Sequence, residues 1–171
     1  HWLHVVTTDM LTLMALHLKR GFEAGEARGP RLQFRGVLVH DGWLAYKALE
    51  CEHALCNQHH LRELTHLLEE QGQAWAGDII HVLTHANHLD NLNCAEGRTP
   101  DYASEAYQSE VQELRDLYEA ILAHAQTEHP IAASTGKRGR VKQSAATNLI
   151  RRLVTYSDEV WRFMTQPNVP F

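Results

Sequence analysis

Asp41 is the side chain whose type and position best fit chemistry. It closes the segment FRGVLVHDGW, in which the apolar run 37–39 is bounded by Gly36 and Gly42. A β-branched run this short predicts a buried strand rather than a helix. Asp41 then stands at the strand's carboxyl end, where open α/β sheets usually place ligands and metals. A carboxylate suits a hard cation such as Mg²⁺ or Mn²⁺, although Asp-Gly after a strand is also typical of a simple turn.

A second group of candidate ligands follows within the segment CEHALCNQHH, namely Cys51, His53, Cys56, His59 and His60. Thiolate and imidazole are the usual zinc ligands. Cys51 to Cys56 is expected to lie along one short strand, whereas structural zinc sites take ligand pairs from two separate elements. A packed cysteine and a histidine at a helix start are therefore the alternative to a zinc site.

Three further patterns have a functional and a plain interpretation. Arg62 can bind a phosphate or a carboxylate through paired hydrogen bonds, or it lies on a solvated helix face. A helical stripe of histidines can bind a transition metal, or it is an exposed face. A cluster of cations can follow a DNA backbone, or it is a solvated loop. The stripe consists of His81, His85 and His88, and the cluster of Lys137, Arg138, Arg140 and Lys142.

The elements before Asp41 are expected to be strands. Apolar residues alternate on both sides of residues 7–9, which predicts a β-hairpin. Four glycine and proline positions between 21 and 30 allow only a short helix before the strand at 34–40. A brief helix should follow Asp41, and then a short strand at 54–56.

The spacing of the apolar residues changes from about His59 onward, where they recur every three or four positions instead of alternating. This predicts an amphipathic helix pair broken near Gly72. Thr99 and Pro100 fit the cap and first position of another helix, which should stop before Pro130. Residues 131–143 are then predicted to form an exposed basic loop.

Two more helices are expected near the end of the chain. One should run from about Ser144 to Tyr156. The next should begin with Ser157 as its cap, with Asp158 and Glu159 in the first turn. The chain as a whole therefore changes from strands to helices.

Composition bounds the function classes. The 171 residues carry a formal net charge of -5, whereas a dedicated nucleic-acid-binding domain is usually basic. Three cysteines are too few for a disulfide framework and favour a reducing cytoplasm. No stretch is apolar enough to span a bilayer, so no membrane association is expected.

The segments FRGVLVHDGWLAYKAL and HALCNQHHLRELTHLLEEQGQAWA resemble the middle region of DDE transposases of the insertion-sequence 66 family. The resemblance extends from HWLHVVTT to DEVWRFMTQPNVPF. It implies an enzyme that cleaves and joins DNA by divalent-metal-assisted phosphoryl transfer. It also implies Mg²⁺ or Mn²⁺ as cofactor, transposon-end and target DNA as partners, and a homo-oligomeric working assembly.

In this family three carboxylates hold the metal ions, and the resemblance places only the second, on Asp41. We expect the first to lie upstream of His1 and the third downstream of Phe171. The chain is then a central piece of the catalytic core, inactive alone and without a tightly bound ion. Several DDE groups also place a Cys-x-x-His after the second Asp. Here that motif is Cys56 and His59, which would brace the active-site strand against the helices.

The implied fold is α/β, a truncated RNase H-like sheet over residues 1–58 followed by a mainly helical insertion over 59–171 that leads back to the core. The absent first strand would lie between the hairpin and the Asp41 strand, which leaves backbone groups unpaired. We expect the hairpin to re-pair with the Asp41 strand, to dock poorly, or to pair with another copy. A five-stranded sheet would contradict this strand count.

Two other functions fit the residues. The helices can form a non-catalytic protein-interaction module, with the sheet as a remnant. Alternatively, Cys56 and His59 can belong to a small zinc-binding domain.

Overall fold

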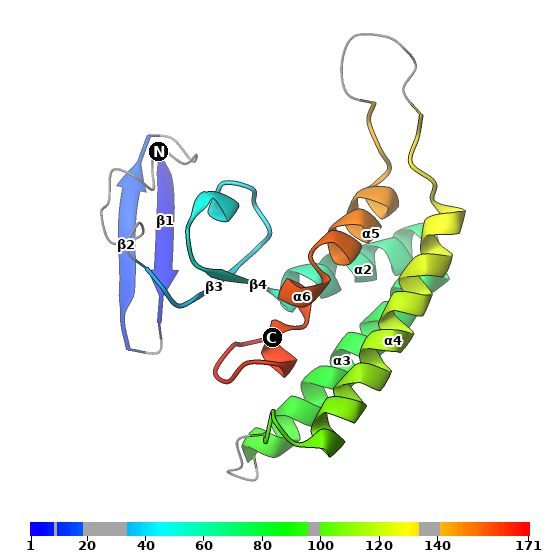
Figure 1. The fold of residues 1–171 in the computed structure, drawn as a ribbon. Helices are drawn as coiled ribbons and strands as arrows, with labels where there is room; N and C mark the ends of the chain where they lie inside the picture. Colours follow the sequence, from blue (N-terminus) through cyan, green and yellow to red (C-terminus); the bar gives the residue numbers. More distant parts are fainter. Residues whose placement is uncertain (9, 19–33, 96–99, 134–140) are drawn as a thin grey trace. The chain divides into compact units, whose positions relative to one another are not determined.

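The computed structural model describes residues 1–8, 10–18, 34–95, 100–133 and 141–171. The chain divides into two compact units, His1–His53 and Ala54–Phe171. Small sheets dominate the first unit and helices the second (Figure 1). The order of elements confirms the expected change from strands to helices and the α/β class. The domain division at 58/59 stays a prediction.

The first unit opens with the predicted hairpin. Strand β1 (Trp2–Thr7) pairs antiparallel with β2 (Thr12–His17). The amide of Thr8 donates to the Leu11 carbonyl over 2.8 Å and closes the turn. The hydroxyls of Thr7 and Thr12, which face each other across the strands, lie 2.9 Å apart. The alternation of apolar and polar residues thus predicted this element correctly.

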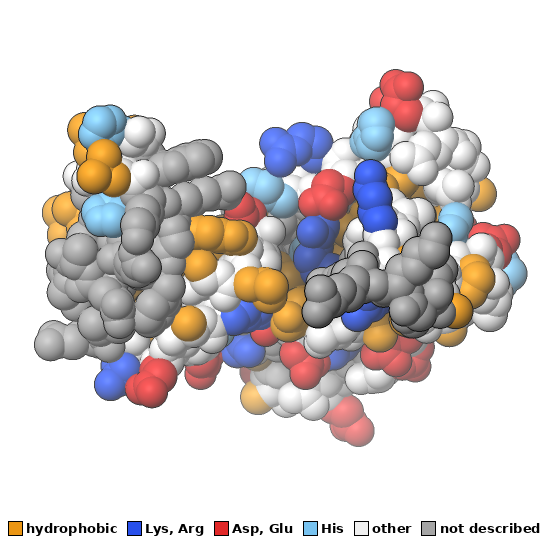
Figure 2. Space-filling model, turned by 90° about the horizontal axis from the view of Figure 1, so that it is seen from above, with side chains coloured by type: hydrophobic (Ala, Val, Ile, Leu, Met, Phe, Trp, Pro, Cys, Tyr) orange, Lys and Arg blue, Asp and Glu red, His pale blue; other side chains and the backbone are white. Residues whose placement is uncertain are grey.

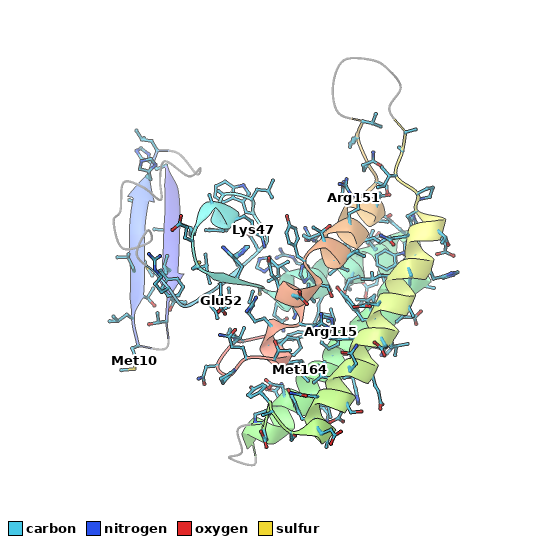
Figure 3. The ribbon with its side chains drawn as sticks, viewed as in Figure 1. Met10, Lys47, Glu52, Arg115, Arg151 and Met164 are labelled. Carbon is cyan, nitrogen blue, oxygen red and sulfur yellow. The ribbon has the colours of Figure 1, made fainter. Side chains whose placement is uncertain are left out.

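One face of the hairpin is apolar and exposed. Leu3 lies opposite Leu16, and Val5 lies opposite Met14. All four side chains are exposed, as is Met10 at the tip of the hairpin (Figure 3). A two-stranded hairpin is marginal by itself, and exposed apolar patches usually mark a contact surface. The hairpin therefore has an apolar face of the kind that usually packs against another element. The described residues do not cover this face.

The strand that leads to Asp41 belongs to a second small sheet. Strand β3 (Val37–His40) pairs with β4 (Glu52–Leu55), and a short 3₁₀ helix, η2 (Tyr46–Ala48), lies between them in the chain. Among the described strands, β1–β2 and β3–β4 are separate sheets. Of the three outcomes expected for the hairpin, re-pairing with the strand before Asp41 is therefore wrong for the described residues. Poor docking and pairing with another copy stay predictions. The weak helix expected after residue 20 falls on residues 19–33, outside those that the structure describes.

The strand predicted at 54–56 is found two residues earlier. Cys56 has φ -70° and ψ 109° and is the N-cap of helix α2 (Asn57–Gln71). The apolar residues Ala54 and Leu55 that suggested the strand are its buried end. The strand passes directly into the helix, because Cys56 is the last residue with extended backbone.

The second unit begins with the predicted helix pair, α2 and α3 (Ala74–Ala95). Gly72 ends α2 with a left-handed backbone, φ 63°, and its amide donates to the Leu68 carbonyl over 3.1 Å. The amide of Gln73 donates to the Leu67 carbonyl over 3.2 Å. Glycine adopts this conformation without the strain that a Cβ introduces. The predicted break near Gly72 is confirmed.

Helix α4 (Glu105–Glu128) lies beside α3 (Figure 1) and ends before Pro130 as predicted. Its predicted start at Pro100 is wrong. Ser104 is the N-cap, and its hydroxyl accepts a hydrogen bond from the Tyr107 amide over 3.3 Å. Turns that use the carbonyls of Pro100 and Asp101 occupy the residues before it. The better capping side chain sets the helix start.

Helix α5 (Ala145–Thr155) lies where a helix was predicted, and Ser144 is its N-cap. The next helix, α6 (Ser157–Val160), is followed by η3 (Arg162–Met164). Ser157 does not cap α6, because the Tyr156 carbonyl accepts from the amides of Glu159 and Val160. The Ser157 hydroxyl is buried without a hydrogen-bond partner among the described residues.

The core of the helical unit gathers around Trp161 and Tyr118, which are fully buried and meet edge to face at 5.5 Å. The Tyr118 hydroxyl donates to the Leu153 carbonyl over 3.0 Å and so links α4 to α5. At the surface, Arg115 (labelled in Figure 3) pairs with Asp158 at 2.6 Å. None of the described helices has the length and hydropathy to cross a membrane. Helices α4, α5 and α6 are thus fastened by both apolar and polar contacts.

Candidate active site

Asp41 directly follows β3 and is half-buried. Its Oδ1 accepts a hydrogen bond from the Trp43 amide over 3.0 Å, and Gly42 has a left-handed backbone with φ 83°. This is an Asx turn, so the plain interpretation of the Asp-Gly pair is correct as local geometry. A carboxylate has two oxygens and several lone pairs, so capping a turn does not prevent it from ligating a metal.

A metal site needs more ligands than Asp41 supplies. In the part of the chain that the structure describes, no three side chains of the types His, Cys, Asp and Glu gather as a metal cluster. One hard oxygen donor matches the chemistry of Mg²⁺ or Mn²⁺, but it is a fraction of the six ligands that such ions take. The metal-binding role of Asp41 stays a prediction.

Two histidines lie beneath this turn and hydrogen-bond to each other. His40, the last residue of β3, accepts from the Gly42 amide at Nδ1 over 3.0 Å. Its Nε2 lies 3.1 Å from Nδ1 of His53, a residue of β4. Nε2 of His53 lies 3.1 Å from the Leu49 carbonyl oxygen. Together these hydrogen bonds connect the peptide after Asp41 to the loop before β4.

The surroundings of His40 disfavour its charged form. The side chain is 6% exposed, and burial lowers the pKa of His40 to about 4, with the Lys47 ammonium (labelled in Figure 3) and His53 contributing and Asp41 opposing. Tyr46 covers the ring at 5.2 Å between centroids, and Trp43 meets Tyr46 edge to face at 5.6 Å. His40 is therefore neutral at physiological pH and packs against the Tyr46 ring.

Sequence reasoning missed His40 and considered His53 only as a zinc ligand. The available signal was the histidine that ends the apolar run just before Asp41 in VLVHDGW. A polar ring at the end of a buried strand must find hydrogen-bond partners. Its partner, however, comes from a strand that follows thirteen residues later. Only the pairing of β3 with β4 brings the two rings together.

Cys56 and His59 occupy the first turn of α2. Both are half-buried, and Cys56 is a free thiol. Nδ1 of His59 is buried without a hydrogen-bond partner among the described residues. The structure thus places the two residues at the junction of strand and helix, and their bracing role stays a prediction.

The buried hydrogen bonds of this junction come from the neighbouring residues Asn57 and His60. The Asn57 side-chain amide donates to the Val160 carbonyl over 2.9 Å, and its Oδ1 lies 3.0 Å from Nδ1 of His60. Because Oδ1 can only accept, His60 carries its proton on Nδ1. Asn57 is 0% exposed and His60 is 2% exposed. The two residues fasten the start of α2 to the end of α6.

Stability of the helical unit is expected to fall in acid because of His60. Burial, with Arg152 and His59 contributing, lowers the pKa of His60 to about 3. The unfolded chain takes up this proton near pH 6.5 and the folded chain does not, so the free energy of unfolding rises with pH between 3 and 6.5. From pH 6.5 to pH 4.5 we expect a loss of about 2–3 kcal/mol, measured by urea unfolding.

The control for this prediction is His60→Asn, which keeps a donor near Asn57 and does not titrate. Its unfolding free energy should depend less steeply on pH, with a residual slope from the other titratable groups of the unit. An unchanged slope in the variant would show that His60 is not the cause.

The predicted DNA contacts are only partly described. Arg62 lies on the exposed side of α2, and Lys142 is exposed just before α5. Lys137, Arg138 and Arg140 lie outside the described residues. Figure 2 shows positive, negative and histidine side chains intermingled on the visible face of the helices. The assignment of these cations to DNA binding stays a prediction.

The histidine stripe of α3 is exposed. His81, His85 and His88 all lie at the surface of the helix. They do not form part of a metal cluster within the described ranges. Their exposure agrees with the plain interpretation of an outer helix face.

The whole chain matches one protein family. The family model described as Transposase IS66 family covers residues 1–171. No curated protein and no solved structure matched the chain. The family match extends over Asp41 and the strand before it, the paired histidines and all the described helices. The chain therefore belongs to the IS66 transposase family.

Proposed function

We propose that this chain is the central part of a DDE transposase catalytic core, which cuts DNA and joins DNA ends by divalent-metal-assisted phosphoryl transfer. The observation that carries the proposal is the place of Asp41. Its carboxylate directly follows a strand, in a chain matched from end to end by a transposase family. The alternatives, an interaction module and a small zinc domain, have no comparable support.

Asp41 is proposed to be one of several carboxylates that hold Mg²⁺ or Mn²⁺ in the complete enzyme. When bound, two such ions activate the attacking oxygen and stabilise the leaving 3'-oxygen. Asp41 contributes a hard ligand whose direction is set by its turn with Trp43. One carboxylate does not hold two ions in register, so we expect the 171-residue chain alone to be inactive.

The hairpin and the β3–β4 pair are proposed to be parts of one RNase H-like sheet in the complete protein. Exposed apolar residues such as Leu3 and Leu16 support this, because a two-stranded hairpin needs further strands or a covering helix for stability. In this arrangement Cys56 and His59 brace the strand-to-helix junction. The helices from Asn57 onward form the insertion that leads back to the core.

Transposon-end and target DNA are the proposed partners, and the working assembly is proposed to be a homo-oligomer in the cytoplasm. Arg62 and Lys142 are exposed and available to phosphates. The cations Lys137, Arg138 and Arg140 precede Lys142 in the chain. Because the net charge is -5, most of the DNA-binding affinity is expected to come from other parts of the transposase.

The test is a cleavage assay with the protein extended on both sides. DNA that carries both ends of the genomic element should be nicked and joined when Mg²⁺ or Mn²⁺ is present, and left intact with a chelator. The 171-residue chain serves as the inactive comparison. Metal-independent cleavage, or no cleavage at all by the extended protein, would overturn the proposal.

A further inference from the structure

The hydrogen bonds of His40 and His53 allow one consistent assignment of donors and acceptors. At one end the Gly42 amide can only donate, so Nδ1 of His40 accepts and its proton lies on Nε2. That proton then points to Nδ1 of His53, which accepts. The proton of His53 lies on Nε2 and points to the Leu49 carbonyl, which can only accept. A backbone donor and a backbone acceptor thus fix both tautomers.

This chain of hydrogen bonds acts on the peptide that follows Asp41. The amide that His40 holds belongs to Gly42, whose φ of 83° turns the chain sharply after the strand. The next amide, of Trp43, holds Oδ1 of Asp41. Two consecutive amides are therefore fixed, one by the imidazole of His40 and one by the carboxylate. A shift of the first peptide moves the second and redirects the carboxylate.

The other end of this series of hydrogen bonds lies in the neighbouring strand. His53 belongs to β4, which pairs with β3, and its ring meets the His40 ring edge to face at 5.2 Å. Leu49, whose carbonyl accepts from His53, follows η2 directly. The turn after Asp41 is thus tied to the loop that returns to the sheet. Tyr46 packs against the His40 ring, and Trp43 packs against Tyr46.

We propose that His40 and His53 are positioning residues for Asp41, which hold the Gly42 peptide so that the carboxylate keeps one direction. This inference rests on the proposed role of Asp41 in transposition. Neither histidine touches DNA or metal in it. Groups that orient a ligand in this way typically change metal affinity or activity about 10- to 100-fold when they are replaced.

The first test measures tautomers in the 171-residue chain and needs no activity. Long-range proton–nitrogen NMR at pH 7 should show that His40 and His53 both carry the proton on Nε2. His60 provides an internal contrast, because Oδ1 of Asn57 requires its proton on Nδ1. An Nδ1 proton on His40 or on His53 would overturn the inference.

The second test compares two variants of each histidine in the extended transposase. His40→Asn keeps an acceptor at the position of Nδ1, and His53→Asn keeps the acceptor for His40. His40→Phe and His53→Phe keep a flat ring without any acceptor. We expect His40→Phe to lower kcat about 10- to 100-fold with little change in KM for DNA, and to raise the Mn²⁺ concentration needed for half-maximal rate. His40→Asn should recover most of the rate.

A matched control comes from His129→Phe in the helical unit. His129 is a half-buried histidine in another hydrogen-bond cluster, 2.6 Å from Oε1 of Gln73. Its replacement should change stability but not the cleavage rate. A His40→Asn variant as slow as His40→Phe, with both folded, would contradict the positioning role.

The two proposals fail in different ways. If Asp41→Asn abolishes cleavage and His40→Phe does not slow it, the positioning role is wrong and the proposed function stands. If Asp41→Asn is without effect, the proposed function is wrong. In that case the tautomers still decide whether the hydrogen-bond chain exists.

Discussion

Asp41→Asn is expected to lower the DNA cleavage rate of the extended transposase roughly 1,000-fold or more, which corresponds to about 4 kcal/mol of lost transition-state stabilisation. The variant removes the negative charge that a divalent cation needs. It keeps the turn, because the side-chain oxygen of asparagine still accepts from the Trp43 amide. The protein should therefore fold normally and bind DNA without cutting it. Cleavage of end-carrying DNA under single-turnover conditions measures this effect.

Asp101→Asn is the matched control for this prediction. Asp101 also caps a turn, with Oδ1 accepting from the Ala103 amide over 3.1 Å. It lies at an exposed position before α4, outside the proposed site. Its variant should cleave DNA at the normal rate. If both variants were equally active, Asp41 would be a turn residue and no more.

Asn57→Leu is expected to lower the free energy of unfolding of the helical unit by about 3 kcal/mol. The variant leaves the Val160 carbonyl and the His60 Nδ1 proton without their partners in a dry interior. Both groups then lose hydrogen bonds that water does not replace. Urea unfolding monitored by circular dichroism measures the loss.

The control for Asn57 is Asn91→Leu, which makes the same replacement at an exposed site on α3. The Asn91 amide donates to Asn87 over 3.2 Å at the helix surface. Water replaces such a bond, so the free energy of unfolding should change by less than about 0.5 kcal/mol. Equal effects of the two variants would contradict the role of Asn57 as a buried link.

Much of the local structure could be predicted from the sequence, because single residues decide it. The left-handed backbone after α2 favours a residue that adopts a positive φ without steric strain, and Gly72 is such a residue. Ser144 caps α5 through its own hydroxyl. The failures occur where two signals compete. Pro100 is a good first helical residue, but Ser104 forms the hydrogen bond that starts α4.

The candidate site was only partly predictable for a different reason. Asp41 follows its strand in the sequence, so its position could be read from the pattern of residues. The link between His40 and His53 depends on which strands pair, and the link between Asn57 and Val160 spans 103 residues. No local pattern contains these contacts. They appear only when separate elements are placed together.

The central claim, that the Asp41 carboxylate binds a catalytic metal ion, is tested most directly by Asp41→Cys in the extended transposase. A thiolate is a poor ligand for Mg²⁺ and a better one for the softer Mn²⁺. We predict that this variant is inactive with Mg²⁺ and regains cleavage with Mn²⁺, at least about 10-fold above its Mg²⁺ rate. The native protein should show no such gap. A variant whose rate has no dependence on the choice of metal would contradict the claim.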